Sequence, residues 1–421
     1  MAASIRVLAH GLRRLGQLDA GFLRLLAVAG VGNAVGRALG LVFAALVAAL
    51  FPPVEYGYIR WAMSAAMLAA IPAAAGPVAL ARALGAARDD AFRQRGLVTL
   101  GLLAIGGMTV LCAAGAAVVL SAAGRPYGGP VVVLVGTTLY SACFGVYRGT
   151  GDAWRMAALY VGGNGLQLLL VIVLCWWLGL IEPDLVLVIF GIAWLPLLLG
   201  LPMRFRGAVG RLEARGLLGD LWRVWAPQML AHAAYTAWVG GDLVLVEHFL
   251  GPSSAGYYGL AKTGATVFLL VPEAVTMLLL PHVAAQGRQA SGLTLRLLLL
   301  TAAVSLLLLV SVPLVAPALL SAFNGGRYSA SAVALPGVSV GMAIYTLYLV
   351  LEGHVVGLGR TGAHAAGISV MAVVTLTTAV LLLPTQGLVG AGLAYAVGAS
   401  AGFVSLAVVG LRPWARPEPG H

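Results

Sequence analysis

Apolar runs separated by short polar connections fill the chain from about residue 22 to about residue 411. Most of the runs hold about 20 or more apolar residues, which is the length that an α-helix needs to cross a hydrocarbon core of about 30 Å. The pattern predicts helices at about 22–51, 56–81, 96–120, 128–147, 156–180, 184–203, 224–250, 255–281, 292–318, 331–355, 362–384 and 387–411. The predicted fold is therefore all-α, a polytopic membrane protein with about twelve transmembrane helices.

The composition agrees with this pattern. Hydrophobic residues make up 61% of the 421 residues and charged residues 9%, and so few charges do not cover the surface of a soluble protein. The 56 glycines are expected where membrane helices pack closely through small side chains. The three cysteines lie inside apolar runs, which argues against a disulfide framework or a metal site.

The basic residues mark one side of the membrane. Even-numbered connections between the predicted helices carry most of them, with Arg125 and Arg327 as the main exceptions. The arginines of the even-numbered connections are Arg82, Arg88, Arg93, Arg95, Arg148, Arg155, Arg204, Arg206, Arg211, Arg215, Arg223, Arg288, Arg296 and Arg360. By the positive-inside rule, these connections and both termini are predicted to be cytoplasmic. The net charge of +11 thus indicates topology rather than nucleic-acid binding.

Two segments outside the apolar runs are predicted to be amphipathic and to lie on the lipid headgroups. They are the first twenty residues and the basic central connection at 204–223. The chain then divides into an N-terminal six-helix lobe at 1–203, a cytoplasmic amphipathic linker at 204–223 and a C-terminal six-helix lobe at 224–421. No connection is long enough to hold an extramembrane domain with an active site.

The two halves resemble each other around their second and eighth predicted helices. The matching positions are Pro53 with Pro252, Gly57 with Gly256, and Pro72 with Pro272. Because each half holds an even number of helices, both halves enter the membrane from the same face, and a parallel pseudo-two-fold axis is predicted to relate them. Two such bundles can rock and open a central cavity to either side in turn, while the mid-helix prolines allow bending. The alternative is an inherited duplication without rocking.

A family resemblance rests on Asn33, Arg37 and two longer stretches. The stretches are GLVFAALVAALFPPVEYGYIRW in the first half and VGGDLVLVEHFLGPSSAGYYGLAKTGATVFLLVPEAVTMLLLPHVA in the second. Over about residues 22–411, the chain resembles the polysaccharide-transport branch (flippases for O-antigen and other lipid-linked oligosaccharides) of the multidrug, oligosaccharidyl-lipid and polysaccharide flippase superfamily. Asp242 and the Gly-Pro turn that follows it look like that family's hairpin of seventh and eighth helices.

The resemblance implies that the protein flips a polyprenyl-diphosphate-linked oligosaccharide from the cytoplasmic to the outer leaflet of a bacterial inner membrane, for surface polysaccharide synthesis. It also implies contact with membrane lipids, glycan polymerases as partners, H⁺ or Na⁺ as a coupling ion, and no cofactor. The related lipid II flippases have fourteen transmembrane helices, whereas about twelve are predicted here. This difference sets the chain apart from them.

Charged residues inside the predicted helices are the candidate site residues, because a charge at the bilayer centre costs about 2.5–3.5 kcal/mol on insertion scales. Arg37 lies deep in the first helix, where its guanidinium matches the oxygens of a substrate diphosphate. A structural ion pair with an acid on another helix is the alternative. Asn33 lies one turn earlier on the same face, and it would bind either sugar hydroxyls or a neighbouring helix.

Asp242 and Lys262 are each ten residues from the turn at Pro252, so they are predicted to lie at similar depth on neighbouring helices. An ion pair is the first expectation. In the functional alternative the two part during the cycle, Lys262 binding phosphate and Asp242 taking up a proton or sodium ion. Glu273 follows Pro272 in an apolar run, and it would either carry a proton or pair across the cavity.

Three further ionisable residues lie nearer the ends of the predicted helices. Arg60, near the outer end of the second helix, would be a solvated rim residue or part of an outward-facing phosphate site. Glu352 and His354, near the inner end of the tenth helix, are expected to reach water, with ion coupling as the alternative.

The chain lacks the motifs of the main enzyme classes. It has no phosphate-cradling glycine loop with Lys and Ser/Thr, no His–Glu metal motif and no nucleophile elbow, so neither an ATPase nor a catalytic site is expected. The main prediction is a flippase for a lipid-linked saccharide. The rivals are a multidrug cation antiporter and, from a different class, a membrane polysaccharide polymerase or ligase. The short outer loops argue against the last.

Overall fold

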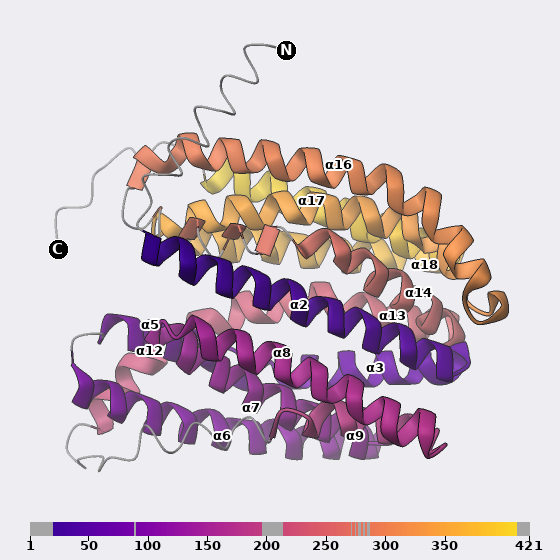
Figure 1. Cartoon of the computed structure of the whole chain (residues 1–421), viewed down its shortest axis with the longest axis horizontal. Coiled ribbons are helices and arrows are strands. Elements are labelled where there is room, and N and C mark those ends of the chain that lie inside the picture. The colour runs from indigo at the N-terminus through magenta and orange to yellow at the C-terminus, as the bar shows by residue number, and fades with distance from the viewer. Residues whose placement is uncertain are drawn as a thin grey trace.

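The computed structural model describes residues 20–87, 90–195, 214–270 and 287–410, together with residues 272, 273, 275, 276, 279, 280 and 283. Its α-helices are α2 (Ala20–Leu50), α3 (Pro53–Ala69), α4 (Ile71–Ala74), α5 (Gly76–Ala86), α6 (Ala91–Ala122), α7 (Gly128–Thr150), α8 (Ala153–Leu170), α9 (Pro183–Ile192), α12 (Ala214–Thr236), α13 (Asp242–Leu250), α14 (Pro252–Ala265), α16 (Ser291–Ala322), α17 (Ser331–Gly357) and α18 (Thr361–Gly410). Within these residues the fold is all-α (Figure 1).

The prediction of an all-α fold with about twelve membrane helices is confirmed. Among the described residues, eight helices are long and apolar enough to cross a membrane, and α3 with α4 and α5 forms a ninth, bent span. The 50-residue helix α18 holds two of the predicted spans, because Gly387 has non-helical backbone angles (φ 56°, ψ −133°). The shorter helices α9 and α14 form the first parts of the sixth and eighth spans, and the rest of these two spans lies partly outside the described residues.

The two spans with mid-helix prolines are both irregular. The second span bends by 65° between α3 and the segment Ile71–Gly85. The eighth span changes from α14 to a 3₁₀ turn at Thr266–Leu269, just before Pro272. A proline cannot donate a backbone hydrogen bond, so a break near each proline follows from the sequence.

The helices form two lobes (Figure 1). Helices α2 to α9 make the N lobe, and α13 to α18 make the C lobe. Helix α12 begins beside the N lobe, where Leu221 and Trp225 pack into the cluster that includes Leu80 of α5. The Trp225 indole donates a hydrogen bond of 2.8 Å to the carbonyl oxygen of Pro72 at the bend. Residues 214–223 of the predicted linker are thus the first turns of α12, and residues 204–213 lie outside the described part. Of the first twenty residues, predicted to be amphipathic, only Ala20 is described.

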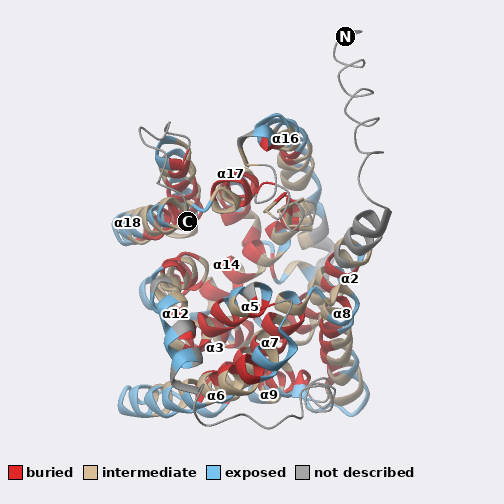
Figure 2. Ribbon diagram, turned by 90° about the vertical axis from the view of Figure 1, so that its left-hand side faces the viewer, coloured by how far each residue is buried: buried red, intermediate tan, exposed pale blue. Residues whose placement is uncertain are grey.

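The flanks of the molecule are apolar and exposed. Helices α6 and α16 lie at opposite edges of the fold, and both are largely exposed along their lengths (Figure 2). Their exposed residues include Leu103, Val110, Leu306 and Leu314. Long helices that are apolar on their outer faces are expected where lipid, not water, surrounds the protein.

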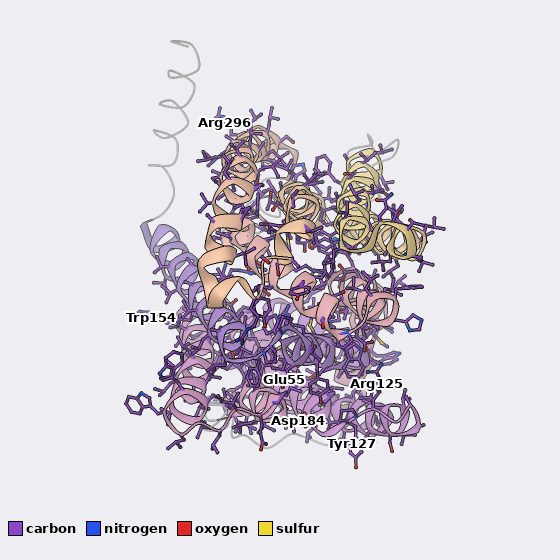
Figure 3. All side chains as sticks on the ribbon, turned by 90° about the vertical axis from the view of Figure 1, so that its right-hand side faces the viewer. Glu55, Arg125, Tyr127, Trp154, Asp184 and Arg296 are labelled. Atoms are coloured by element: carbon purple, nitrogen blue, oxygen red, sulfur yellow. The ribbon has the colours of Figure 1, made fainter. Side chains whose placement is uncertain are left out.

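The connections between spans fall at two ends of the bundle. The end that carries the arginine-rich connections is called the basic end here, and it holds Ala20, the connections at Ala87, Gly151 and Gly359, and Gly410. The opposite end is called the far end. It holds the connections at Phe51, Arg125, Gly179, Gly251 and Gly326. Figure 3 looks onto the far end and labels Arg125 and Asp184 there.

Candidate functional site

A cavity of about 560 Å³ lies between the lobes. The residues that line it are Asn33, Arg37, Tyr140, Phe144, Arg148, Met156, Ala157, Tyr160, Glu273, Thr276, Leu280, Leu349 and Glu352. Helices α2, α7 and α8 of the N lobe supply one wall, and α17 with the segment around Glu273 supplies the other. Because Arg148 and Glu352 stand near the last turns of their helices, the cavity extends from the middle of the bundle towards the basic end.

An ion pair between the lobes stands at the end of this cavity that is nearest the middle of the bundle. The Arg37 Nε donates a hydrogen bond of 2.6 Å to Oε2 of Glu273, and the Arg37 Nη2 contacts the other carboxylate oxygen. The Asn33 amide donates to Oε2 of Glu273 at 3.1 Å. Three sequence-predicted site residues from two lobes are therefore in direct contact. Their position at the cavity wall leaves 19% of the Arg37 side chain and 24% of the Glu273 side chain exposed.

Small residues on α2 place Asn33 and Arg37 at the cavity. A Cβ on Gly32 would overlap Ala157 of α8, and a Cβ on Gly36 would overlap the ring of Tyr160. The glycines therefore let α2 lie against α8, as small residues do between membrane helices. The neighbouring positions of α2 then face the segment around Glu273.

A second, smaller cavity of about 180 Å³ continues from Arg37 towards the far end. Arg37 and Tyr160 line both cavities, so the Arg37–Glu273 pair stands where they meet. Arg60 of α3 lines the smaller cavity, and its Nε is buried without a hydrogen-bond partner among the described residues. The structure thus places Arg60 on an internal surface in the far half of the molecule.

Asp242 and Lys262 are brought together, but away from both cavities. The Lys262 Nζ lies 2.8 Å and 2.9 Å from the two carboxylate oxygens of Asp242, and the Tyr258 hydroxyl donates to the same carboxylate at 2.6 Å. Asp242 is 2% exposed and Lys262 5% exposed. The pair is a saturated, dry contact inside the C lobe, since neither residue lines either of the two cavities.

A π-helical turn supplies a hydrogen-bond acceptor for the Lys262 ammonium group. Residues Ala237–Gly241 form a π-helical turn just before α13, and the carbonyl oxygen of Val239 in this turn accepts a hydrogen bond of 2.7 Å from Lys262. The ammonium group also lies 4.7 Å from the ring centroid of Tyr395. Single π-turns concentrate at functional sites, and here the turn adds a ligand to a buried cation.

Two further ionisable groups of the larger cavity were missed as site residues. Arg148 was assigned to a basic connection, because an arginine at the end of an apolar run is what topology predicts. Glu352 was expected to reach water, and it does so at the cavity wall, 3.7 Å from the His364 ring. His354 differs from expectation: it is buried, and its Nδ1 lies 2.8 Å from the Thr294 hydroxyl.

The far end is closed by contacts between the lobes. Gly57 of α3 and Gly256 of α14 let the two helices touch, because a Cβ on Gly57 would overlap the carbonyl oxygen of Pro252 and one on Gly256 would overlap that of Pro53. The matched positions of the internal repeat thus pack on each other.

Two polar contacts reinforce this closure. The Tyr328 hydroxyl donates a hydrogen bond of 2.9 Å to the carbonyl oxygen of Phe51. Burial raises the pKa of Tyr328, so that this hydroxyl remains a donor. Arg125 pairs with Glu247 at 3.1 Å. The larger cavity thus lies between the lobes in a conformation whose far end is closed.

Replacing Gly57 with alanine is expected to open the far end. The added methyl group meets backbone atoms that cannot turn aside, and such overpacking costs about 1–3 kcal/mol. In a cysteine-free background, T263C in the smaller cavity should react with a membrane-impermeant thiol reagent about tenfold faster when G57A is added. Gly264→Ala is the matched control, because a Cβ on Gly264 meets nothing within 4 Å. Equal labelling in G57A and the unmodified background would contradict closure by these glycines.

Comparisons with known proteins identify the fold. No protein-family model and no curated protein sequence matches the chain. Among solved structures, the lipid II flippase MurJ in its inward-closed conformation has a TM-score of 0.71 at 11% identity, covering 91% of this chain and 87% of that one. A multidrug resistance MATE family transporter in its inward-facing conformation has a TM-score of 0.63 at 18% identity, covering 92% and 93%.

A third similar structure is a MOP superfamily transporter from Pyrococcus furiosus whose binding pocket is described as having reverse polarity. Its TM-score is 0.63 at 15% identity, and the match covers 92% of this chain and 93% of that one. All three likenesses extend over nearly the whole chain and include both lobes. The chain therefore has the twelve-helix, two-lobe fold of the MOP superfamily, which its sequence resembles.

Proposed function

We propose that the protein is a flippase that moves a polyprenyl-diphosphate-linked oligosaccharide across the bacterial inner membrane by alternating access, for surface polysaccharide synthesis. The observation that carries the proposal is the cavity between the lobes, with Arg37 where it meets the smaller cavity and with the far end of the molecule closed. Its volume of about 560 Å³ falls in the range of about 300–1,000 Å³ that is usual for binding sites of small molecules.

The orientation of this cavity supports loading from the cytoplasm. The positive-inside rule assigns the basic end to the cytoplasmic side, together with both termini. The larger cavity then faces the cytoplasm. The family resemblance implies that the saccharide is carried from this side to the outer leaflet. In this proposal the head group enters the cavity while the polyprenyl tail stays in lipid, and rocking of the lobes exposes the head group at the far end.

Arginine chemistry supports a diphosphate as the bound group. A guanidinium presents paired N–H donors that match phosphate oxygens, and Arg37 already uses two of its nitrogens in this way on the Glu273 carboxylate. A substrate diphosphate would take the place of that carboxylate on Arg37. Glu273, once displaced, is a group that can take up a proton, and Asp242 is the second candidate for ion coupling. Asn33 and Arg60 line the cavities and complete the set of proposed binding residues. Lys262 lines neither cavity, so it would bind phosphate only after parting from Asp242 during the cycle.

A reconstituted transport assay tests the proposal. Proteoliposomes holding a fluorescent polyprenyl-diphosphate oligosaccharide are treated with a membrane-impermeant reagent that destroys fluorescence in the accessible leaflet. Flipping makes the protected fraction accessible during the assay, whereas protein-free liposomes keep it protected. Equal protection with and without the protein would contradict the proposed function.

A multidrug cation antiporter is the second candidate. Two carboxylates, Glu273 and Glu352, line the larger cavity, and acids there would favour cationic drugs. Expression of the protein in a drug-sensitive bacterial strain distinguishes the two functions. Higher resistance to several cationic drugs, together with no flipping of the saccharide lipid, would favour the antiporter.

A further inference from the structure

Arg148 is the unengaged cation of the larger cavity. It lies in the last turn of α7, its side chain is exposed, and it lines the cavity near the basic end. Among the described residues its guanidinium has no hydrogen bond or salt bridge, whereas that of Arg37 is held by Glu273 and that of Arg155 by Asp152 at 3.3 Å. A charged group that faces a cavity without a partner in the protein is available to a ligand.

The packing of α7 directs Arg148 into the cavity. Tyr140, Phe144 and Arg148 are spaced four residues apart, so they form one stripe on the helix, and all three line the cavity. Gly145 and Gly149 lie on another face, where a Cβ would press on backbone atoms of Pro77 and Ala81 in α5. These close contacts fix the rotation of α7 and hence the direction of the stripe.

Glu352 is the acid that could neutralise Arg148 from the opposite wall. Both residues are described, and no ion pair forms between them in this conformation. The side chain that contacts the Glu352 carboxylate is His364, whose Nδ1 lies 3.7 Å from it, so Glu352 acts on Arg148 only through space. The mouth of the cavity therefore presents the Arg148 guanidinium to an incoming anion.

We infer that Arg148 is the entry site for the diphosphate of the substrate. The inference rests on the proposed function and adds a residue and an order of events to it. The phosphate oxygens bind Arg148 first, because its N–H donors are free, and then compete with Glu273 for Arg37. Along α7, Tyr140 lies eight residues before Arg148, about 12 Å closer to the middle of the bundle. The stripe thus leads from the mouth towards Arg37.

Inorganic pyrophosphate is the probe that tests this inference. The full-length protein in lipid nanodiscs is titrated by calorimetry, and Arg148→Ala is expected to raise the Kd of pyrophosphate about tenfold or more, since hydrogen bonds to charged groups are among the stronger ones. Arg148→Lys keeps the charge but lacks the planar guanidinium, so its Kd for pyrophosphate should lie between those of the unmodified protein and Arg148→Ala. Arg148→Gln serves in place of Arg148→Ala if that variant is not monodisperse.

Arg296 provides the matched control. It is an exposed arginine near the start of α16, at the edge of the fold and outside the cavity (Figure 3). Arg296→Ala removes the same charge near the same end and should leave the Kd unchanged. Equal weakening by Arg296→Ala and Arg148→Ala would overturn the inference in favour of general electrostatic attraction.

The remaining outcomes separate the inference from the proposed function. If the unmodified protein binds pyrophosphate and Arg148→Ala binds it equally well, Arg148 is not the entry site, and the flippase proposal stands. If the unmodified protein does not bind pyrophosphate, the diphosphate cargo itself is contradicted. Lost transport with unchanged pyrophosphate binding would assign Arg148 to closure of the cavity mouth and would also overturn the inference.

Discussion

Replacing Arg37 with alanine is expected to abolish export of the lipid-linked glycan while the amount of folded protein in the membrane stays the same. The guanidinium lines both cavities and stands where they meet, so a head group that moves from one to the other comes into contact with it. Glu273 loses its charged partner, but 24% of its side chain is exposed and Asn33 still donates to it, so water in the cavity can replace the lost contact. Export should fall by about 100-fold or more, as expected when a charge-assisted, two-pronged contact is removed.

A double variant separates substrate binding from a purely structural ion pair. Glycan export and membrane protein levels are measured for Arg37→Ala and for Arg37→Ala combined with Glu273→Gln. If the arginine only neutralises Glu273, the second substitution removes the unpaired charge and export returns. If it binds the diphosphate, export stays lost in both. Full export by Arg37→Ala alone would remove Arg37 from the mechanism.

The spans were predictable because they depend on local sequence. A run of about 20 apolar residues is long enough to cross the bilayer wherever it packs, and the breaks near Pro72 and Pro272 follow from the missing backbone donor. The double span in α18 was also predictable, since the sequence divides it at Gly387, whose φ of 56° favours glycine. The start of α12 was not predictable from the sequence, because its helical turns are stabilised by packing on the N lobe.

The site was predictable in its residues but only partly in its contacts. Asp242 and Lys262 lie at equal distances from one hairpin turn, so their proximity follows from the sequence alone. Arg37 and Glu273 are 236 positions apart, and their contact depends on how α2 lies between the lobes. Arg148 escaped notice because an arginine at the end of a span has a topological explanation. The π-turn that offers the Val239 carbonyl oxygen has no sequence signature.

Replacing Asp242 with alanine is expected to destabilise the folded protein strongly. Among the residues that the structure describes, Lys262 would keep only the carbonyl oxygen of Val239 as a hydrogen-bond acceptor, and its buried charge would be unpaired. Removing one partner of a buried ion pair costs about 3–5 kcal/mol. This is the opposite of the Arg37–Glu273 pair, where cavity water can solvate the group that remains. Lys262→Met should be milder, because the Tyr258 hydroxyl and the backbone N–H of Leu243 still donate to Asp242.

Melting temperatures of the purified proteins test this order. Asp242→Ala should melt lowest, Lys262→Met higher, and the double variant Asp242→Ala/Lys262→Met above Asp242→Ala, because apolar replacement of both charges removes the desolvation penalty. A double variant less stable than Asp242→Ala would contradict the argument from an unpaired lysine.

The same double variant also tests ion coupling. If it folds and flips the saccharide lipid at the normal rate, Asp242 carries no coupling ion, and Glu273 remains the candidate that can be reached from the cavity.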